Sequence, residues 1–142
     1  PTGGVIFDEK EIKSAYAIGK GAILARGTAE VEDGPRDSHQ ILITAIPYQV
    51  NKSELIETMA NLVQEKRIEG VRDIRDESDK EGMRIAIELK QDASPQKVLN
   101  NLYKYTDLEK SFHLNMLALV GGIQPQVLSL KAFLEYYLKL RE

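Results

Sequence analysis

The chain has 142 residues, of which 42% are hydrophobic and 29% charged, and 19 basic against 22 acidic residues give a formal net charge of −3. This length and apolar fraction are typical of a compact domain with a real core and exclude a disordered chain. The absence of cysteine excludes disulfides, thiolate zinc sites and cysteine nucleophiles. Because no apolar run is long enough to cross a membrane and no signal peptide is recognisable, we expect a cytoplasmic protein with no membrane partner.

The acidic charge is concentrated in one stretch of the chain. Residues 69–81 hold six acidic and three basic residues, which account for the whole net charge. In the remaining residues, positive and negative charges are equal in number. A nucleic-acid partner would therefore have to bind to a local basic patch, because the surface as a whole is not basic.

The N-terminal part predicts a short helix followed by a long hairpin. Asp8 caps a helix that ends at Gly19. Alternating apolar residues then predict a long strand over 21–32, and a turn leads to a second strand over 40–46. These two strands should pair, and Pro47 ends the second because proline cannot donate to the ladder.

The clearest helix follows a cap at Asn51 or Ser53, with one apolar stripe at helical spacing: Leu55, Ile56, Met59, Leu62 and Val63. Short strands are predicted over 71–74 and 84–90, joined by a polar turn. Ser94 and Pro95 start another helix, with serine as its cap and proline at its first position. Residues 112–120 are apolar on both faces, as expected for a central strand.

The order from 40 to 120 is therefore β-α-β-β-α-β. That order is typical of a ferredoxin-like α+β fold, in which two helices cover one face of a four-stranded antiparallel sheet. Residues 1–39 form a helix and hairpin extension, and Ser129 caps a last helix over 129–142. Because the chain lacks an initial methionine and this helical pattern runs to its end, we expect a piece of a longer polypeptide.

Two features invite a catalytic interpretation. The acidic residues of 69–81 resemble a cation site, but basic residues are interleaved among them, so we favour a solvated, salt-bridged hairpin. Among the tyrosines, Tyr48 in the loop after Pro47 is the most interesting candidate nucleophile, yet no arginine or histidine beside it would activate its phenol. The residues show no catalytic constellation, and they favour a binding or mechanical domain that holds no metal or cofactor of its own.

The basic residues that we select for contact with a polyanion are Lys20 and Arg26 near the hairpin, Arg36 at its tip, and Lys52 at a helix N-terminus. The N–H groups at that helix end would add to the attraction of phosphate. Ordinary surface charge is an equally weighted alternative at this point.

Several motifs, in order and over essentially the whole chain, resemble one family. They are Pro1-Thr2-Gly3-Gly4, Gly19-Lys20-Gly21, Ile46-Pro47-Tyr48-Gln49-Val50-Asn51-Lys52, Glu69-Gly70-Val71, Arg75-Asp76-Glu77-Ser78-Asp79, Gly82-Met83-Arg84-Ile85, Leu99-Asn100-Asn101-Leu102-Tyr103 and Asn115-Met116-Leu117-Ala118-Leu119. The chain is thereby similar to the A subunit of bacterial DNA gyrase and its topoisomerase IV counterpart.

The resemblance implies that residues 1–128 are a non-catalytic tower domain and that 129–142 begin the helix leading to a coiled coil. The parent would be an ATP-dependent type II topoisomerase, which cleaves one duplex, passes another through it and reseals the break. The cleavage tyrosine lies upstream in the family. This fragment alone should therefore be inactive, although its parent is an enzyme.

The resemblance also implies the partners. The tower would hold and bend duplex DNA, and Lys20, Arg26 and Lys52 are our choice of DNA-binding residues. ATP and Mg²⁺ would act through the gyrase B subunit, and the parent A subunit would form a homodimer within a heterotetramer. A different class of function, a ferredoxin-like regulatory module that binds a small ligand, is the alternative, and an enzyme that uses Tyr48 comes third.

Overall fold

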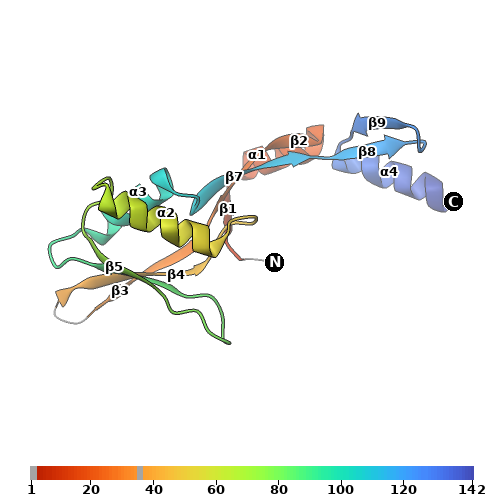
Figure 1. Cartoon of the computed structure of the whole chain (residues 1–142). Coiled ribbons are helices and arrows are strands. Elements are labelled where there is room, and N and C mark those ends of the chain that lie inside the picture. Colours follow the sequence, from red (N-terminus) through yellow and green to blue (C-terminus); the bar gives the residue numbers. More distant parts are fainter. Residues whose placement is uncertain (1–2, 35–36) are drawn as a thin grey trace. The chain divides into compact units, whose positions relative to one another are not determined.

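The computed structural model describes residues 3–34 and 37–142, and the chain divides into two compact units (Figure 1). The first, which we call the sheet unit, comprises the described residues of Pro1–Val5 and Ala25–Lys110. The second, the helix–hairpin unit, comprises Ile6–Leu24 and Ser111–Glu142.

The elements follow one another as β1 (Val5–Phe7), α1 (Glu9–Ile18), β2 (Lys20–Arg26), β3 (Thr28–Asp33), β4 (His39–Ala45), α2 (Lys52–Gln64), β5 (Val71–Asp76), β6 (Ile85–Leu89), α3 (Pro95–Tyr105), β7 (Glu109–Asn115), β8 (Leu117–Val120), β9 (Gln124–Val127) and α4 (Leu130–Arg141). The predicted mixed α+β class is confirmed. None of the helices in the described part of the chain is long and apolar enough to span a membrane.

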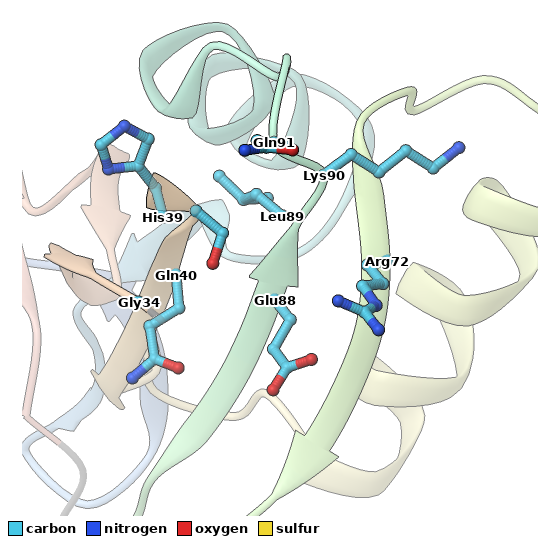
Figure 2. A pocket seen from close by; sticks show the side chains of 9 residues that line it. Gly34, His39, Gln40, Arg72, Glu88, Leu89, Lys90 and Gln91 are labelled. Atoms are coloured by element: carbon cyan, nitrogen blue, oxygen red, sulfur yellow. The ribbon is translucent and has the colours of Figure 1, made fainter. Parts of the chain in front are cut away.

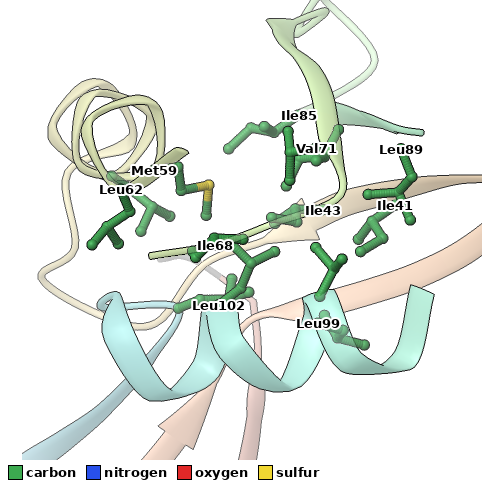
Figure 3. Packing of buried hydrophobic residues seen from close by; sticks show 14 of the residues in the cluster. Ile41, Ile43, Met59, Leu62, Ile68, Val71, Ile85, Leu89, Leu99 and Leu102 are labelled. Atoms are coloured by element: carbon green, nitrogen blue, oxygen red, sulfur yellow. The ribbon is translucent and has the colours of Figure 1, made fainter. Parts of the chain in front are cut away.

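The sheet unit is built on a four-stranded antiparallel sheet in the order β3-β4-β6-β5. Every second residue of its central strands is buried in the main core, including Ile41 and Ile43 of β4 and Ile85 and Ile87 of β6. Side chains from α2 and α3 converge on the same core (Figure 3). The period-two and helical patterns of the sequence therefore correspond to one shared apolar layer.

The prediction that residues 112–120 form the fourth strand of this sheet is wrong. Residues 112–120 belong to two strands, β7 in the sheet β1-β2-β7 and β8 in a hairpin with β9. The pairing changes at Met116, whose N–H donates to the Gly19 carbonyl at 2.7 Å and whose carbonyl accepts from Leu128 N–H at 2.9 Å. Instead, β3 pairs with β4 and forms the edge of the sheet. Along the chain, the four strands of this sheet and the helices α2 and α3 therefore follow the order β-β-α-β-β-α rather than β-α-β-β-α-β.

The predicted long strand over 21–32 is also divided. β2 ends at Arg26 and β3 starts at Thr28, so that Gly27 stands between two different sheets. Gly27 N–H donates to the Leu108 carbonyl at 2.8 Å, and a Cβ at this position would lie only 2.5 Å from the Ala45 carbonyl oxygen. The close approach therefore requires glycine. The predicted hairpin is confirmed by the pairing of β3 with β4.

The predicted helix starts are confirmed at two caps. The Asp8 side chain accepts from Lys10 N–H and Glu11 N–H at the start of α1, which ends at Gly19 with φ of 92°. The Asn51 side chain accepts from Ser53 N–H at 2.9 Å at the start of α2. α3 begins after Ser94, as predicted, although the Ser94 side chain makes no capping bond.

The helix–hairpin unit has few buried side chains. Among the described residues of this unit, the buried apolar side chains are Ala15 and Ile23. The β8–β9 hairpin and α4 leave large apolar side chains in solvent, with Leu119 63% and Leu140 83% exposed. α4 itself has no buried residue.

Candidate nucleic-acid interface

Lys20 is an exposed cation at the start of β2, in the helix–hairpin unit. The preceding Gly19 closes α1 with an N–H bond to the Ala15 carbonyl at 2.8 Å, so the backbone that carries Lys20 is fixed. Its surroundings are a shallow depression that His113 and Asn115 also line. Within residues 3–34 and 37–142 no ion pair engages Lys20, so its charge is available to a ligand.

Arg26 lies at the other end of β2, in the sheet unit, and its charge is engaged. Its Nε is 2.6 Å from Glu109 Oε2, and its guanidinium stacks 4.8 Å from the centre of the Tyr103 ring. Burial raises the pKa of Tyr103, and the Arg26 charge partly opposes that rise. Arg26 therefore ties β2 to β7 and α3 through a cation–π contact and an ion pair.

Lys52 is the first residue of α2, and its Nζ lies 3.0 Å from Asp76 Oδ2. The pKa of Asp76 is lowered to about 2, first by the hydrogen bond from the Ser78 side chain and then by that from Lys52. The Lys52 side chain remains one-third exposed. A phosphate at this helix end would have to share Lys52 with Asp76. Arg36, the fourth cation selected from the sequence, lies outside the described residues.

The acidic stretch is salt-bridged, as predicted. Arg75 Nη2 lies 3.6 Å from Glu77 Oε1 and also pairs with Glu88, while Arg84 Nε is 3.1 Å from Glu77 Oε2. In the described part of the chain, no group of three histidine, cysteine or carboxylate side chains is placed to hold a metal ion. Arg75 and Arg84 thus neutralise the Glu77 carboxylate.

Two open depressions lie beside the ends of β5 and β6. One, of about 600 Å³, has Arg72, Glu88 and Lys90 in its lining; Figure 2 shows Lys90 at the end of β6 and Arg72 on the neighbouring strand. The other, of about 710 Å³, is lined by four cations among its residues: Lys66, Arg67, Lys90 and Lys97. None of these four cations was predicted from the sequence to bind a ligand. The topology brings them together from three segments, and the only local signal was the adjacent pair Lys66 and Arg67.

Comparison with known proteins identifies relatives over the whole chain. The family model for the A subunit of DNA gyrase/topoisomerase IV matches residues 1–142. The DNA gyrase A subunit of Clostridium acetobutylicum is 49% identical over 142 residues, which are 100% of this chain and 17% of that protein. The DNA gyrase A subunits of Synechocystis sp. and Halalkalibacterium halodurans are 49% and 51% identical over 99% and 97% of this chain, which correspond to 17% and 16% of the respective proteins. The chain thus spans about a sixth of the length of these relatives.

Proposed function

The chain belongs to the family of DNA gyrase and topoisomerase IV A subunits, and from this premise we propose that it is the non-catalytic tower segment of an ATP-dependent type II DNA topoisomerase. In this proposal it holds and bends the cleaved duplex during strand passage. The observation that carries the proposal is the family match over all 142 residues at about half identity.

The proposed ligand is the phosphate backbone of duplex DNA, with Lys20, Arg26 and Lys52 as contacts. Such contacts are sequence-tolerant and salt-dependent, because each phosphate that is neutralised releases condensed counterions. Lys20 is exposed and supports this role directly. Arg26 and Lys52 would exchange or share their carboxylate partners Glu109 and Asp76.

The proposed partners follow from the parent assembly. A gyrase B subunit would supply ATP hydrolysis and the Mg²⁺ that cleavage needs, and a second A subunit would complete the dimer. α4 would lead into a coiled coil, which is supported by the exposed apolar side chains of Leu134 and Leu138 one helical turn apart. The cytoplasm would be the compartment of such an assembly.

The small-ligand alternative has no support. A site for a small ligand is enclosed and mostly apolar, with a few polar groups that orient the molecule. The depressions that we find in the described residues are open, and the two that lie beside the ends of β5 and β6 have three and six charged residues in their linings. Tyr48, the third candidate from the sequence, is 59% exposed.

The test is a titration of the 142-residue chain with duplex DNA at several salt concentrations. We expect weak binding and no cleavage of supercoiled plasmid. Replacing Lys20 and Lys52 by alanine should lower the affinity and reduce the slope of log K against log salt by about 0.9 for each phosphate that is no longer neutralised. Lys13→Ala is the control, because Lys13 pairs with Glu9 on the surface of α1. An affinity unchanged in the double variant would overturn the contact assignment, and plasmid relaxation by the chain alone would overturn the non-catalytic role.

A further inference from the structure

We propose that the four-cation depression of the sheet unit is a further contact surface for the phosphate backbone of duplex DNA. We call it the cationic groove and define it by Lys66, Arg67, Lys90 and Lys97. The inference rests on the proposed function in one respect, the choice of DNA as the polyanion, but it concerns residues that neither the family match nor the motifs assign.

The groove is formed by two loops that a backbone hydrogen bond holds close to each other. The loop from α2 to β5 contains Gly70, whose carbonyl accepts from Lys90 N–H at 2.7 Å in the loop from β6 to α3. Gly70 has φ of 89°, and a Cβ there would lie 2.7 Å from the Ala93 Cβ. Only glycine permits this approach. Lys66 and Arg67, which follow α2, and Lys97 of α3 thereby line the same depression.

The charges in the groove are largely unneutralised. Its lining contains two acidic residues, Glu69 and Asp92, against the four cations. Arg67 has one long contact, 3.5 Å from Nε to Glu65 Oε2, and in the described ranges no ion pair engages the other three. All four side chains are exposed. Positive charge is thus in excess here on a chain whose net charge is −3.

The shape of the surface favours a linear polyanion over a single ion. Lys90 also lines the neighbouring depression together with Arg72 (Figure 2). Because Lys90 is shared, the cations continue from one depression into the next. Duplex DNA presents a charge about every 1.7 Å along its axis and can engage several such cations at once. An open, charged lining does not enclose a small molecule.

The acidic residues at the tip of the β5–β6 hairpin lie far from the cationic groove. Its tip carries Glu77, Asp79 and Glu81, whereas the cationic groove adjoins the other end of the same two strands. A six-residue strand at about 3.3 Å per residue separates the two ends by about 20 Å. This exceeds the Debye length of about 8 Å at physiological salt, so acids at the tip do not cancel the field at the groove.

The test uses amide NMR and affinity measurements on the 142-residue chain with a 16-base-pair duplex. The groove variant is Lys90→Glu with Lys97→Glu. Glutamate is tolerated at position 97 because it lies in the first turn of α3, where negative charge is favourable. Lys80→Glu with Lys110→Glu is the matched control, since both lysines are exposed and lie in the same unit but outside the groove.

We expect DNA to shift the amide signals of 66–70 and 90–97. The groove variant should bind at least about tenfold more weakly, with a salt slope lower by about 2, whereas the control should lose far less. Circular dichroism should show both variants folded. Poly-glutamate at equal charge should produce much smaller amide shifts than the duplex, and equal shifts would overturn nucleic acid as the ligand.

The outcomes separate this inference from the proposed function. DNA-induced shifts confined to the surroundings of Lys20, Arg26 and Lys52, with full affinity in the groove variant, would overturn the groove and leave the proposed function intact. Loss of affinity in the groove variant, with no effect of the Lys20 and Lys52 substitutions, would support the groove and overturn those contacts. A chain that binds no DNA would overturn both.

Discussion

At the scale of single residues, Asp76 shows how hydrogen bonds and a neighbouring cation lower the pKa of a carboxyl group. Ser78 N–H donates to Asp76 Oδ1 at 3.0 Å, and Lys52 Nζ lies 3.0 Å from Oδ2. These partners stabilise the charged form and lower the pKa of Asp76 from 3.8 to about 2. Because the folded pKa lies below the unfolded one, the stabilisation is fully present above pH 3.8 and is lost as the pH falls through about 2.

We therefore predict that the Asp76 carboxyl carbon titrates near pH 2 in an NMR experiment. Ser78→Ala and Lys52→Ala should each raise this pKa toward 3.8, with the larger effect from Ser78 because its hydrogen bond is the largest cause of the shift. Lys80→Ala should leave the pKa unchanged, since Lys80 has no contact with Asp76 among the described ion pairs. A wild-type midpoint near 3.8 would contradict the network.

At the scale of elements, α2 and α3 offer a matched pair of helix starts. Asn51 accepts two backbone N–H bonds at the start of α2, at 2.9 Å from Ser53 and 3.3 Å from Glu54. Ser94 occupies the same position before α3 but makes no capping bond. Asparagine and serine are both preferred N-cap residues, but here only the Asn51 side chain accepts hydrogen bonds from the N–H groups of its helix.

We predict that Asn51→Ala lowers the free energy of unfolding by about 1 kcal/mol. Ser94→Ala should change it by less than about 0.5 kcal/mol, because no hydrogen bond of the cap is removed. Urea unfolding followed by circular dichroism measures both. Asn51→Asp should retain the stability, since a carboxylate also accepts these bonds and interacts favourably with the helix N-terminus. Equal losses for the two alanine variants would show that the side-chain bond is not the source of the effect.

The elements also show which features of the fold a sequence can reveal. Helix starts at Asp8 and Asn51 were predictable because a cap and its helix are neighbours in sequence. The sheet membership of 112–120 was not, because an apolar run does not say which strand it pairs with. The division of the long strand at Gly27 depends on Ala45 and Leu108, which are distant in sequence.

The same distinction applies to the candidate site. Lys20 and Lys52 were selected from the sequence because each stands beside a local signal, a glycine pair or a helix N-terminus. The partners that engage Arg26 and Lys52, Glu109 and Asp76, come from other elements and were not foreseen. The cationic groove was missed for the same reason. Its four cations lie between positions 66 and 97 and meet only because two loops pack at Gly70.

At the scale of the whole molecule, apolar burial is divided unequally between the two units. The sheet unit contains the core formed by the sheet, α2 and α3. The helix–hairpin unit buries two apolar side chains, Ala15 and Ile23, among its described residues. Since apolar burial is the main stabilising contribution, the two units should differ in the free energy at which they open.

We predict that amide hydrogen exchange distinguishes α4 from α2, two helices of 12 and 13 residues. α2 buries Leu55, Met59 and Leu62, whereas α4 buries none of its residues. Most of the stability of a helix in a protein comes from packing its apolar face, so α4 should open locally while the core stays folded. In exchange measured by mass spectrometry, peptides from α4 should exchange at least about tenfold faster than those from α2, which corresponds to an opening free energy lower by about 1.4 kcal/mol. Dilution provides the control, because a partner copy that covers α4 would make its protection rise with concentration. Concentration-independent protection equal to that of α2 would contradict the inference that the stability of the chain resides in the sheet unit.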